Sequence, residues 1–132
     1  MYIYENIRYF FSYLMWCGIL YISYPISHLF LNKYYLPYKH INPKHKQQYF
    51  ISNMIKGIVL GYCSYNATIT LFNYSNGIWD LESIKYLSAI YASTDMVSIF
   101  KVEKMQINTI VHHILVQILF ILSLNISQGP NK

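Results

Sequence analysis

The sequence predicts an all-α fold, a polytopic membrane bundle with about four transmembrane helices in one domain spanning residues 1–132. Two observations carry this prediction. Hydrophobic residues make up 55% of the chain and charged residues only 11%, which is not the balance of an ordinary soluble domain. Four apolar stretches each approach the roughly 20 residues that a helix needs to cross a hydrocarbon core about 30 Å thick.

The four expected spans are residues 9–31, 49–72, 81–100 and 107–124. The first is too long for the apolar region of a secretory signal, and no small-x-small cleavage motif follows it. We therefore predict that it is a membrane span like the other three.

The first connection, "NKYYLPYKHINPKHKQQ" at residues 32–48, has four lysines, and Pro37 and Pro43 prevent a continuous helix there. The positive-inside rule predicts that this loop is cytosolic. The next connection has two acidic residues before its first lysine, whereas "KVEK" at 101–104 is basic again, as a pair of helical hairpins requires. The net charge of +5 is thus explained by membrane orientation, and we expect no nucleic-acid partner.

Polar residues interrupt all the apolar stretches near the same expected membrane face. If "KVEK" is a tight turn, His112 and His113 lie about 10 Å below it and Asp95 about 8 Å below it, at a rise of 1.5 Å per residue. Asn53 and Lys56 fall within about two turns of the start of the second span. Charged groups are costly in a membrane interior and commonly mark functional sites, so this layer is the candidate site.

Helical spacing predicts which faces of the last two spans turn inward. His112 lies about 100° around the helix axis from His113, and we expect His113 to be the inward-facing member of the pair. The two polar stripes, at steps of three or four residues, are Ser88, Tyr91, Asp95 and Ser98 in the third span, and Gln106, Thr109, His113 and Gln117 in the fourth.

The stretch "YLSAIYASTDMVSIFKVEKMQINTIVHHILVQILFIL" resembles the core of the TLC domain. This family of multi-span membrane proteins is named for the translocating-chain-associating membrane protein, ceramide synthase and a neuronal lipofuscinosis protein. The likeness lies in a helix with Tyr91-x-x-x-Asp95 followed by a helix that begins near His112-His113, and it covers roughly residues 46–124. The acidic residues that precede the histidines in ceramide synthases are absent here, and Val116 stands where threonine is usual.

The resemblance implies a polar intramembrane pocket for lipid binding, lipid homeostasis or the escort of a membrane protein. It also leaves open an enzyme, an acyltransferase that transfers an acyl group from acyl-CoA to a lipid amine. The candidate catalytic residues are His112, His113 and Asp95, and the candidate lipid-binding residues are Lys56, Asn53, Tyr91 and Gln117. TLC domains continue into further spans, so we expect a second copy or a partner membrane protein to complete the bundle.

Two further interpretations remain. The chain is a structural membrane protein if its polar groups serve as interhelical hydrogen-bonding partners alone. A membrane hydroxylase would need more histidines around its irons than the two in plausible positions, so we expect neither a metal nor another cofactor. The abundance of Tyr, Ile, Asn and Lys is typical of an AT-rich genome, and an endoplasmic reticulum-like or viral internal membrane is the expected location.

Overall fold

The computed structural model describes the backbone of residues 2–125 and the side chains of residues 6–125. The helices are α1 (Tyr2–Tyr34), α2 (Leu36–Lys39), α3 (Lys44–Ser75), α4 (Leu81–Lys101) and α5 (Ile107–Leu124). The described part of the chain has no β-strand, which confirms the all-α class. The four long helices contain the four stretches expected to be spans.

The first connection breaks where the prolines predict. Pro37 lies in the first turn of α2, where its missing N–H costs nothing, and Pro43 is the residue that precedes α3. Pro25, by contrast, lies inside α1, which nevertheless continues to Tyr34.

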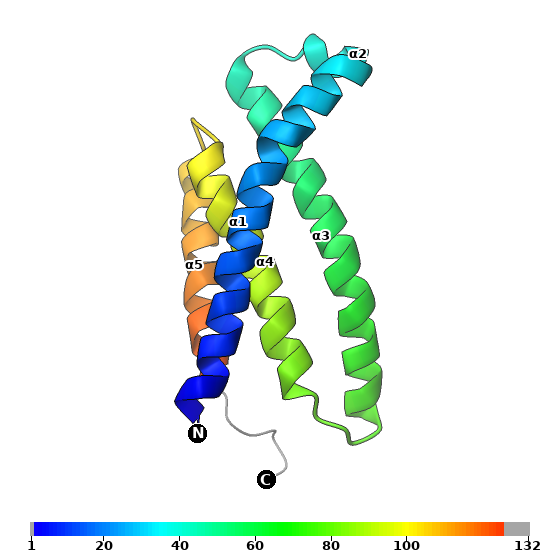
Figure 1. Ribbon diagram of the computed structural model, residues 1–132, viewed down its shortest axis with the longest axis vertical. Helices are drawn as coiled ribbons and strands as arrows, with labels where there is room; N and C mark the ends of the chain where they lie inside the picture. Colours follow the sequence, from blue (N-terminus) through cyan, green and yellow to red (C-terminus); the bar gives the residue numbers. More distant parts are fainter. Residues whose placement is uncertain (1, 126–132) are drawn as a thin grey trace.

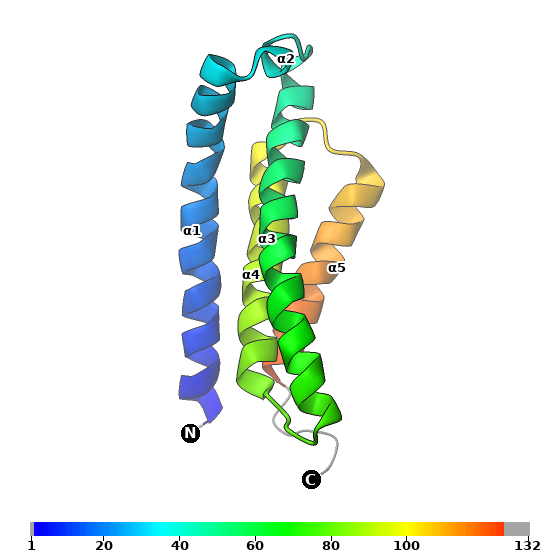
Figure 2. The same ribbon diagram turned by 90° about the vertical axis from the view of Figure 1, so that its right-hand side faces the viewer.

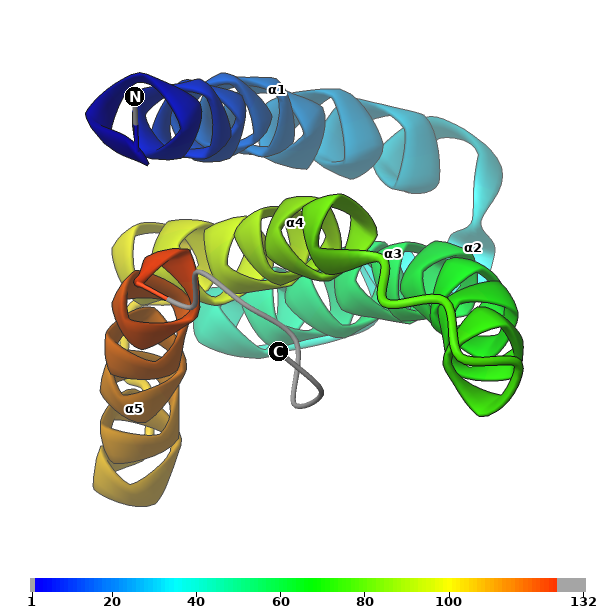
Figure 3. The same ribbon diagram turned by 90° about the horizontal axis from the view of Figure 1, so that it is seen from below.

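The four long helices alternate in direction, and α4 lies among the other three (Figure 1). Helices α1, α3 and α5 all pack against α4. The views in Figure 2 and Figure 3 place α1 on one side of α4, and α3 and α5 on the other. The connection between α1 and α3 and the turn between α4 and α5 share one end of the bundle, which we call the basic end.

Helix α4 owes its central place to small and hydroxylated side chains. Ala89, Ala92 and Ser93 are fully buried, and small residues allow helix backbones to approach closely. Larger apolar residues of α1 and α3, such as Leu20 and Ile55, pack with Ile90 and Val97 of α4 in one cluster.

Two of the described helices are long and apolar enough to cross a membrane: α1, over Asn6–Tyr34, and α5. Only 17% of the residues in the 18-residue apolar stretch of each helix are buried, whereas the core helix of a soluble protein is mostly buried. The exposed faces of both helices carry large apolar side chains such as Phe11, Leu29, Leu115 and Leu119. These features favour association with a membrane. Helices α3 and α4 do not meet the same test, so the expected number of four spans is not established.

Polar contacts set where the helices begin and end. The Asp80 side chain accepts hydrogen bonds from Ser83 N (3.0 Å) and Ser83 Oγ (2.6 Å) at the start of α4. At the end of α5, Lys85 Nζ donates to the Leu124 carbonyl (3.0 Å), where a cation is favourable for the helix dipole.

Gln48 exchanges hydrogen bonds with Glu103, its Nε2 donating to Oε1 (3.1 Å) and its Oε1 accepting from Glu103 N (2.9 Å). The turn before α5 is therefore tied to α3.

Candidate functional site

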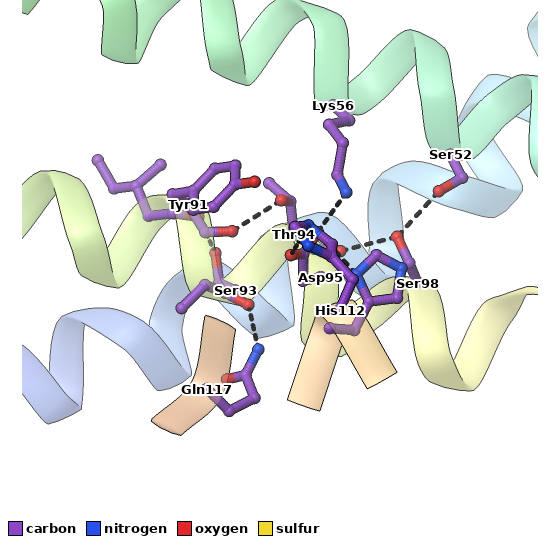
Figure 4. A network of polar contacts seen from close by, with 12 residues as sticks. Ser52, Lys56, Tyr91, Ser93, Thr94, Asp95, Ser98, His112 and Gln117 are labelled. Atoms are coloured by element: carbon purple, nitrogen blue, oxygen red, sulfur yellow. Dashed lines mark hydrogen bonds and ion pairs between the residues drawn. The ribbon is translucent and has the colours of Figure 1, made fainter. Parts of the chain in front are cut away.

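Asp95 is the centre of the polar residues inside the bundle. It lies in the middle of α4, and its side chain is completely buried. Lys56 of α3 and the two histidines of α5 reach it from neighbouring helices. We call these four residues the Asp95 cluster; Figure 4 shows Lys56 and His112 directed toward the Asp95 carboxylate.

The three partners divide between the two carboxylate oxygens. Lys56 Nζ contacts Oδ1, and His113 Nδ1 lies 3.0 Å from the same oxygen. His112 Nε2 lies 3.7 Å from Oδ2. The ammonium of Lys56 therefore compensates the buried negative charge directly, as a buried carboxylate requires.

Charge compensation does not complete the hydrogen bonding of the cluster. Both oxygens of Asp95 and Nδ1 of His113 are buried without a hydrogen bond of acceptable geometry in the described structure. Lys56 forms an ion pair with Asp95 and His113 lies close to the same oxygen, but neither contact has the geometry of a hydrogen bond. Buried polar atoms in folded proteins are nearly always hydrogen-bonded, so these three atoms have unused hydrogen-bonding capacity.

The three partners of Asp95 differ in how far they are exposed. The side chain of His113 is 3% exposed, that of Lys56 is 21% exposed and that of His112 is 55% exposed. The prediction that His113 is the inward-facing histidine is confirmed. His112 nevertheless also reaches Asp95, because the carboxylate presents a second oxygen toward it.

A chain of hydroxyl groups extends from the cluster toward the basic end. Ser98, one turn after Asp95 on α4, forms hydrogen bonds with Ser52 Oγ of α3 (2.9 Å) and with Tyr24 Oη of α1 (3.2 Å). All three side chains are buried. Ser98 was expected from its stripe. Ser52 carries one available signal, its position one turn before Lys56, whereas nothing local to Tyr24 distinguishes it from the other tyrosines of α1.

Gln117 faces inward as predicted, but it contacts other helices and not the cluster. Its Nε2 donates to the Ala92 carbonyl of α4 (2.9 Å), and its Oε1 accepts from Tyr13 Oη of α1 (2.8 Å). This side chain therefore joins three helices, which is the interhelical hydrogen-bonding role that polar residues have in membrane bundles.

The remaining two candidates lie outside the cluster. Tyr91 lies one turn before Asp95 and is half-buried, packed beside the apolar residues of α1 and α5. Asn53 is exposed on α3, and the described structure shows no hydrogen bond or ion pair from it to Asp95. The three-residue step between Asn53 and Lys56 turns the two side chains about 60° apart around the helix, and Asn53 stays exposed beside Lys56. Its role in lipid binding stays a prediction.

Asp95, His112 and His113 also have the spacing of a metal site, since one ligand atom from each lies within 4.8 Å of the others. A count of histidines alone does not reveal this set of three, because one of its members is a carboxylate. Lys56 sets a physical limit on the site, because its ammonium already contacts Oδ1 of Asp95. A divalent cation at this carboxylate would have to displace Lys56 or lie beside its positive charge, so the residues present fit a metal poorly.

Comparison with protein-family models, with curated proteins and with solved structures found no match for this chain.

Proposed function

We propose that this chain is a TLC-like integral membrane protein that crosses the membrane about four times and binds the polar head of a membrane lipid at the Asp95 cluster. Lipid homeostasis or the escort of a membrane protein would then be its cellular role. The observation that carries the proposal is the combination of a fully buried carboxylate with partners that remain 21% and 55% exposed, Lys56 and His112.

The exposure of those two side chains indicates what a ligand would meet first. Lys56 presents N–H donors and His112 presents an imidazole, while the carboxylate lies behind them. Donors of this kind suit the carbonyl, hydroxyl or phosphate oxygens of a lipid head group. The atoms of Asp95 and His113 that have no hydrogen bond could bond to the ligand once its entry moves the side chains of the cluster.

Burial patterns support four spans although α3 and α4 are too polar to meet the composition test for a span. Most of the polar residues of α4 face α1, α3 or α5 and are buried, so lipid would not contact them. On α3, Lys56 is directed toward Asp95, and several polar side chains, such as Asn66 and Thr68, bond to carbonyls of their own helix. A bundle shields such groups from hydrocarbon.

The test is a comparison of lipids that copurify with the wild type, with His112→Ala plus His113→Ala, and with His40→Ala plus His45→Ala. The last variant removes the same number of histidines from outside the cluster. We expect mass spectrometry to show one lipid class retained by the wild type and the control but lost from the cluster variant. Equal retention by all three proteins, at matched helicity, would overturn lipid binding at this site.

One contact favours a second function, acyl transfer. Nδ1 of His113 lies 3.0 Å from Asp95, close enough that a small rotation of the ring would align the two as donor and acceptor. A carboxylate bonded to one ring nitrogen orients imidazole so that its other nitrogen can accept a proton. In this reaction the lipid amine attacks the thioester carbon of acyl-CoA, Nε2 accepts the amine proton, and the thiolate of coenzyme A leaves with a proton returned from the ring. Release of free thiol by the wild type and its loss in His113→Ala would establish this enzyme.

The topology and partners follow from the same proposal. The basic loop 32–48 faces the cytosol of a cell with an endoplasmic reticulum-like or viral internal membrane, by the positive-inside rule. The exposed apolar face of α5 contacts lipid, or else a second copy or partner membrane protein that completes the bundle.

A purely structural protein would instead tolerate apolar replacement of both histidines without loss of bound lipid.

A further inference from the structure

The basic end of the bundle contains a second feature, an open cavity of about 450 Å³. It lies where the end of α1, the short helix α2 and the start of α3 meet, with Lys101 at the end of α4 on its edge. We call it the basic pocket. The apolar part of its lining includes Leu29 and Ile51, and the polar part includes His28, Lys44, Gln48 and Lys101.

The charges around this pocket are strongly one-sided. Among the described residues, this end of the bundle carries six lysines, and its exposed acidic residue is Glu103. The lysines are Lys33, Lys39, Lys44, Lys46, Lys101 and Lys104. Such an excess attracts anions, above all at an anionic membrane surface.

Inside the pocket, two ammonium groups and two side-chain amides are available to an anion. Lys44 Nζ donates to Glu103 Oε1 at 3.3 Å, but these side chains are 75% and 61% exposed, so the pair is weak. Lys101 Nζ lies 3.3 Å from the ring centroid of Tyr21, and the N–H groups of this ammonium that do not face the ring can donate to an oxygen ligand. Gln47 and Gln48 line the pocket as well. The Nε2 of each already donates one hydrogen bond, to the Tyr38 carbonyl and to Glu103 Oε1, and has a second N–H for an anion.

The start of α3 adds to this positive potential. Lys44 is its first residue, and no side chain caps its first turn. The exposed N–H groups and the helix dipole at such an end favour a negative charge. Three residues of this first stretch, Lys44, Gln47 and Gln48, line the pocket.

The opposite wall contains a buried tyrosine and becomes apolar toward the outside. Tyr38 is completely buried, and its hydroxyl lies 2.6 Å from Nδ1 of His28, which holds α2 against α1. Farther out on α1, the side chains of Ile26, Leu29 and Phe30 are more than half exposed. An anion with a hydrocarbon chain could place its charge in the pocket and its chain along this face.

We propose that the basic pocket binds the phosphate head group of an anionic membrane lipid, with Lys44 and Lys101 as its charged ligands and the exposed face of α1 beside its acyl chain. The pocket shares the membrane setting of the proposed function but not the Asp95 cluster. Tyr24 links the two places, since it lines the pocket and its hydroxyl bonds to Ser98. Lipid bound here would thus contact the hydroxyl chain that includes Ser98, one turn after Asp95 on α4.

The test uses the full chain in phosphatidylcholine nanodiscs, with added phosphatidic acid, and measures the retained lipid by native mass spectrometry. Lys44→Gln plus Lys101→Gln should lower retention of phosphatidic acid by about tenfold or more. The matched control, Lys46→Gln plus Lys104→Gln, removes the same charge from exposed lysines outside the pocket and should retain the lipid. If both double variants lose it equally, binding depends on general surface charge and the pocket proposal is wrong.

Two further arms keep the result independent of folding and of the first proposal. Glu103→Gln should increase retention, because it frees Lys44 while its amide oxygen can still accept from Gln48; unchanged or weaker retention contradicts the proposal. His112→Ala plus His113→Ala should leave phosphatidic acid bound, which separates this pocket from the Asp95 cluster. Inorganic phosphate is the competitor: displacement of phosphatidic acid at concentrations equal to those of the lipid would show that the ligand is soluble phosphate.

Discussion

Lys56 and Asp95 form an ion pair between α3 and α4 in which the carboxylate is completely buried and the ammonium side chain is 21% exposed. The lysine is therefore both the charge partner of Asp95 and the part of the pair that a ligand can reach. This relationship connects the stability of the bundle with the proposed binding site.

Loss of one partner of this pair should destabilise the bundle more than loss of both. Lys56→Met leaves an uncompensated buried carboxylate and should lower the free energy of unfolding by about 3 kcal/mol or more. Lys56→Met plus Asp95→Asn removes both charges and should recover part of that loss. Reversible denaturation in detergent measures the cycle, with Lys104→Met as the exposed control; additive losses would mean that the ion pair contributes no coupling.

The two adjacent histidines should differ in their effects. His113 is buried and His112 is 55% exposed, so His113→Ala leaves a cavity and should cost about 2 kcal/mol or more. His112→Ala should change stability by about 0.5 kcal/mol or less but should still reduce the retention of lipid. Thermal unfolding and copurified lipid are measured on the same samples. Equal destabilisation by both substitutions would contradict the assignment of the inward-facing residue.

The contact of Gln117 with Tyr13 should couple α5 to α1. Tyr13→Phe removes one hydrogen bond of 2.8 Å and should cost about 1 kcal/mol. Gln117→Leu also removes the hydrogen bond to the Ala92 carbonyl, so it should lower the free energy of unfolding more than Tyr13→Phe does. In the double variant the two losses should not add, because they share one bond. Full additivity in the unfolding measurements would show that the two side chains act independently.

Asp80 should make the start of α4 sensitive to acid. Hydrogen bonds from the Ser83 hydroxyl, and then from its backbone N–H, hold the pKa of Asp80 below its usual value. Its charged cap therefore contributes fully above the pKa of the unfolded chain and is lost as the pH falls through the lower pKa of the folded chain. Asp80→Ala should cost about 1 kcal/mol at neutral pH, and its difference from the wild type should shrink on acidification.

That pH dependence is measured by thermal unfolding of both proteins from neutral to acidic pH. Asp80→Asn is the control, because a neutral amide can still accept from Ser83 and should show no loss with acid at this position. A difference between wild type and Asp80→Ala that stays constant across the acid range would contradict a charged cap.

The four-span proposal predicts the sidedness of the connections. After Cys17 and Cys63 are replaced by serine, single cysteines at His40 and Lys104 should react with an impermeant thiol reagent from the same side of the membrane. A cysteine at Asn76 should react from the opposite side. Labelling of Asn76 and His40 from one side would show that α3 does not span the membrane.

Local signals were sufficient to predict the helices and part of the site. The ends of α4 and α5 were predicted within one residue, because Asp80 and the polar "KVEK" turn interrupt long apolar runs. Helical periodicity predicted that Asp95, His113 and Gln117 face inward. Asn53 lies near the depth of Lys56 because the two are close in sequence, but it is exposed. Its direction depends on how α3 is rotated against α4, which no local signal gives.

The sequence by itself determined the all-α fold and the helix boundaries near Pro37, Pro43 and Asp80, since these follow from local backbone preference. It also determined the depth at which Asp95 meets the two histidines, since depth follows from the rise per residue of a helix. The tertiary structure decided that Lys56 pairs with Asp95, that Ser52 and Tyr24 meet at Ser98, and that α1, α2 and α3 enclose the basic pocket. These contacts depend on the rotation and lateral order of the helices, which are set by packing over the whole bundle and not by any one segment.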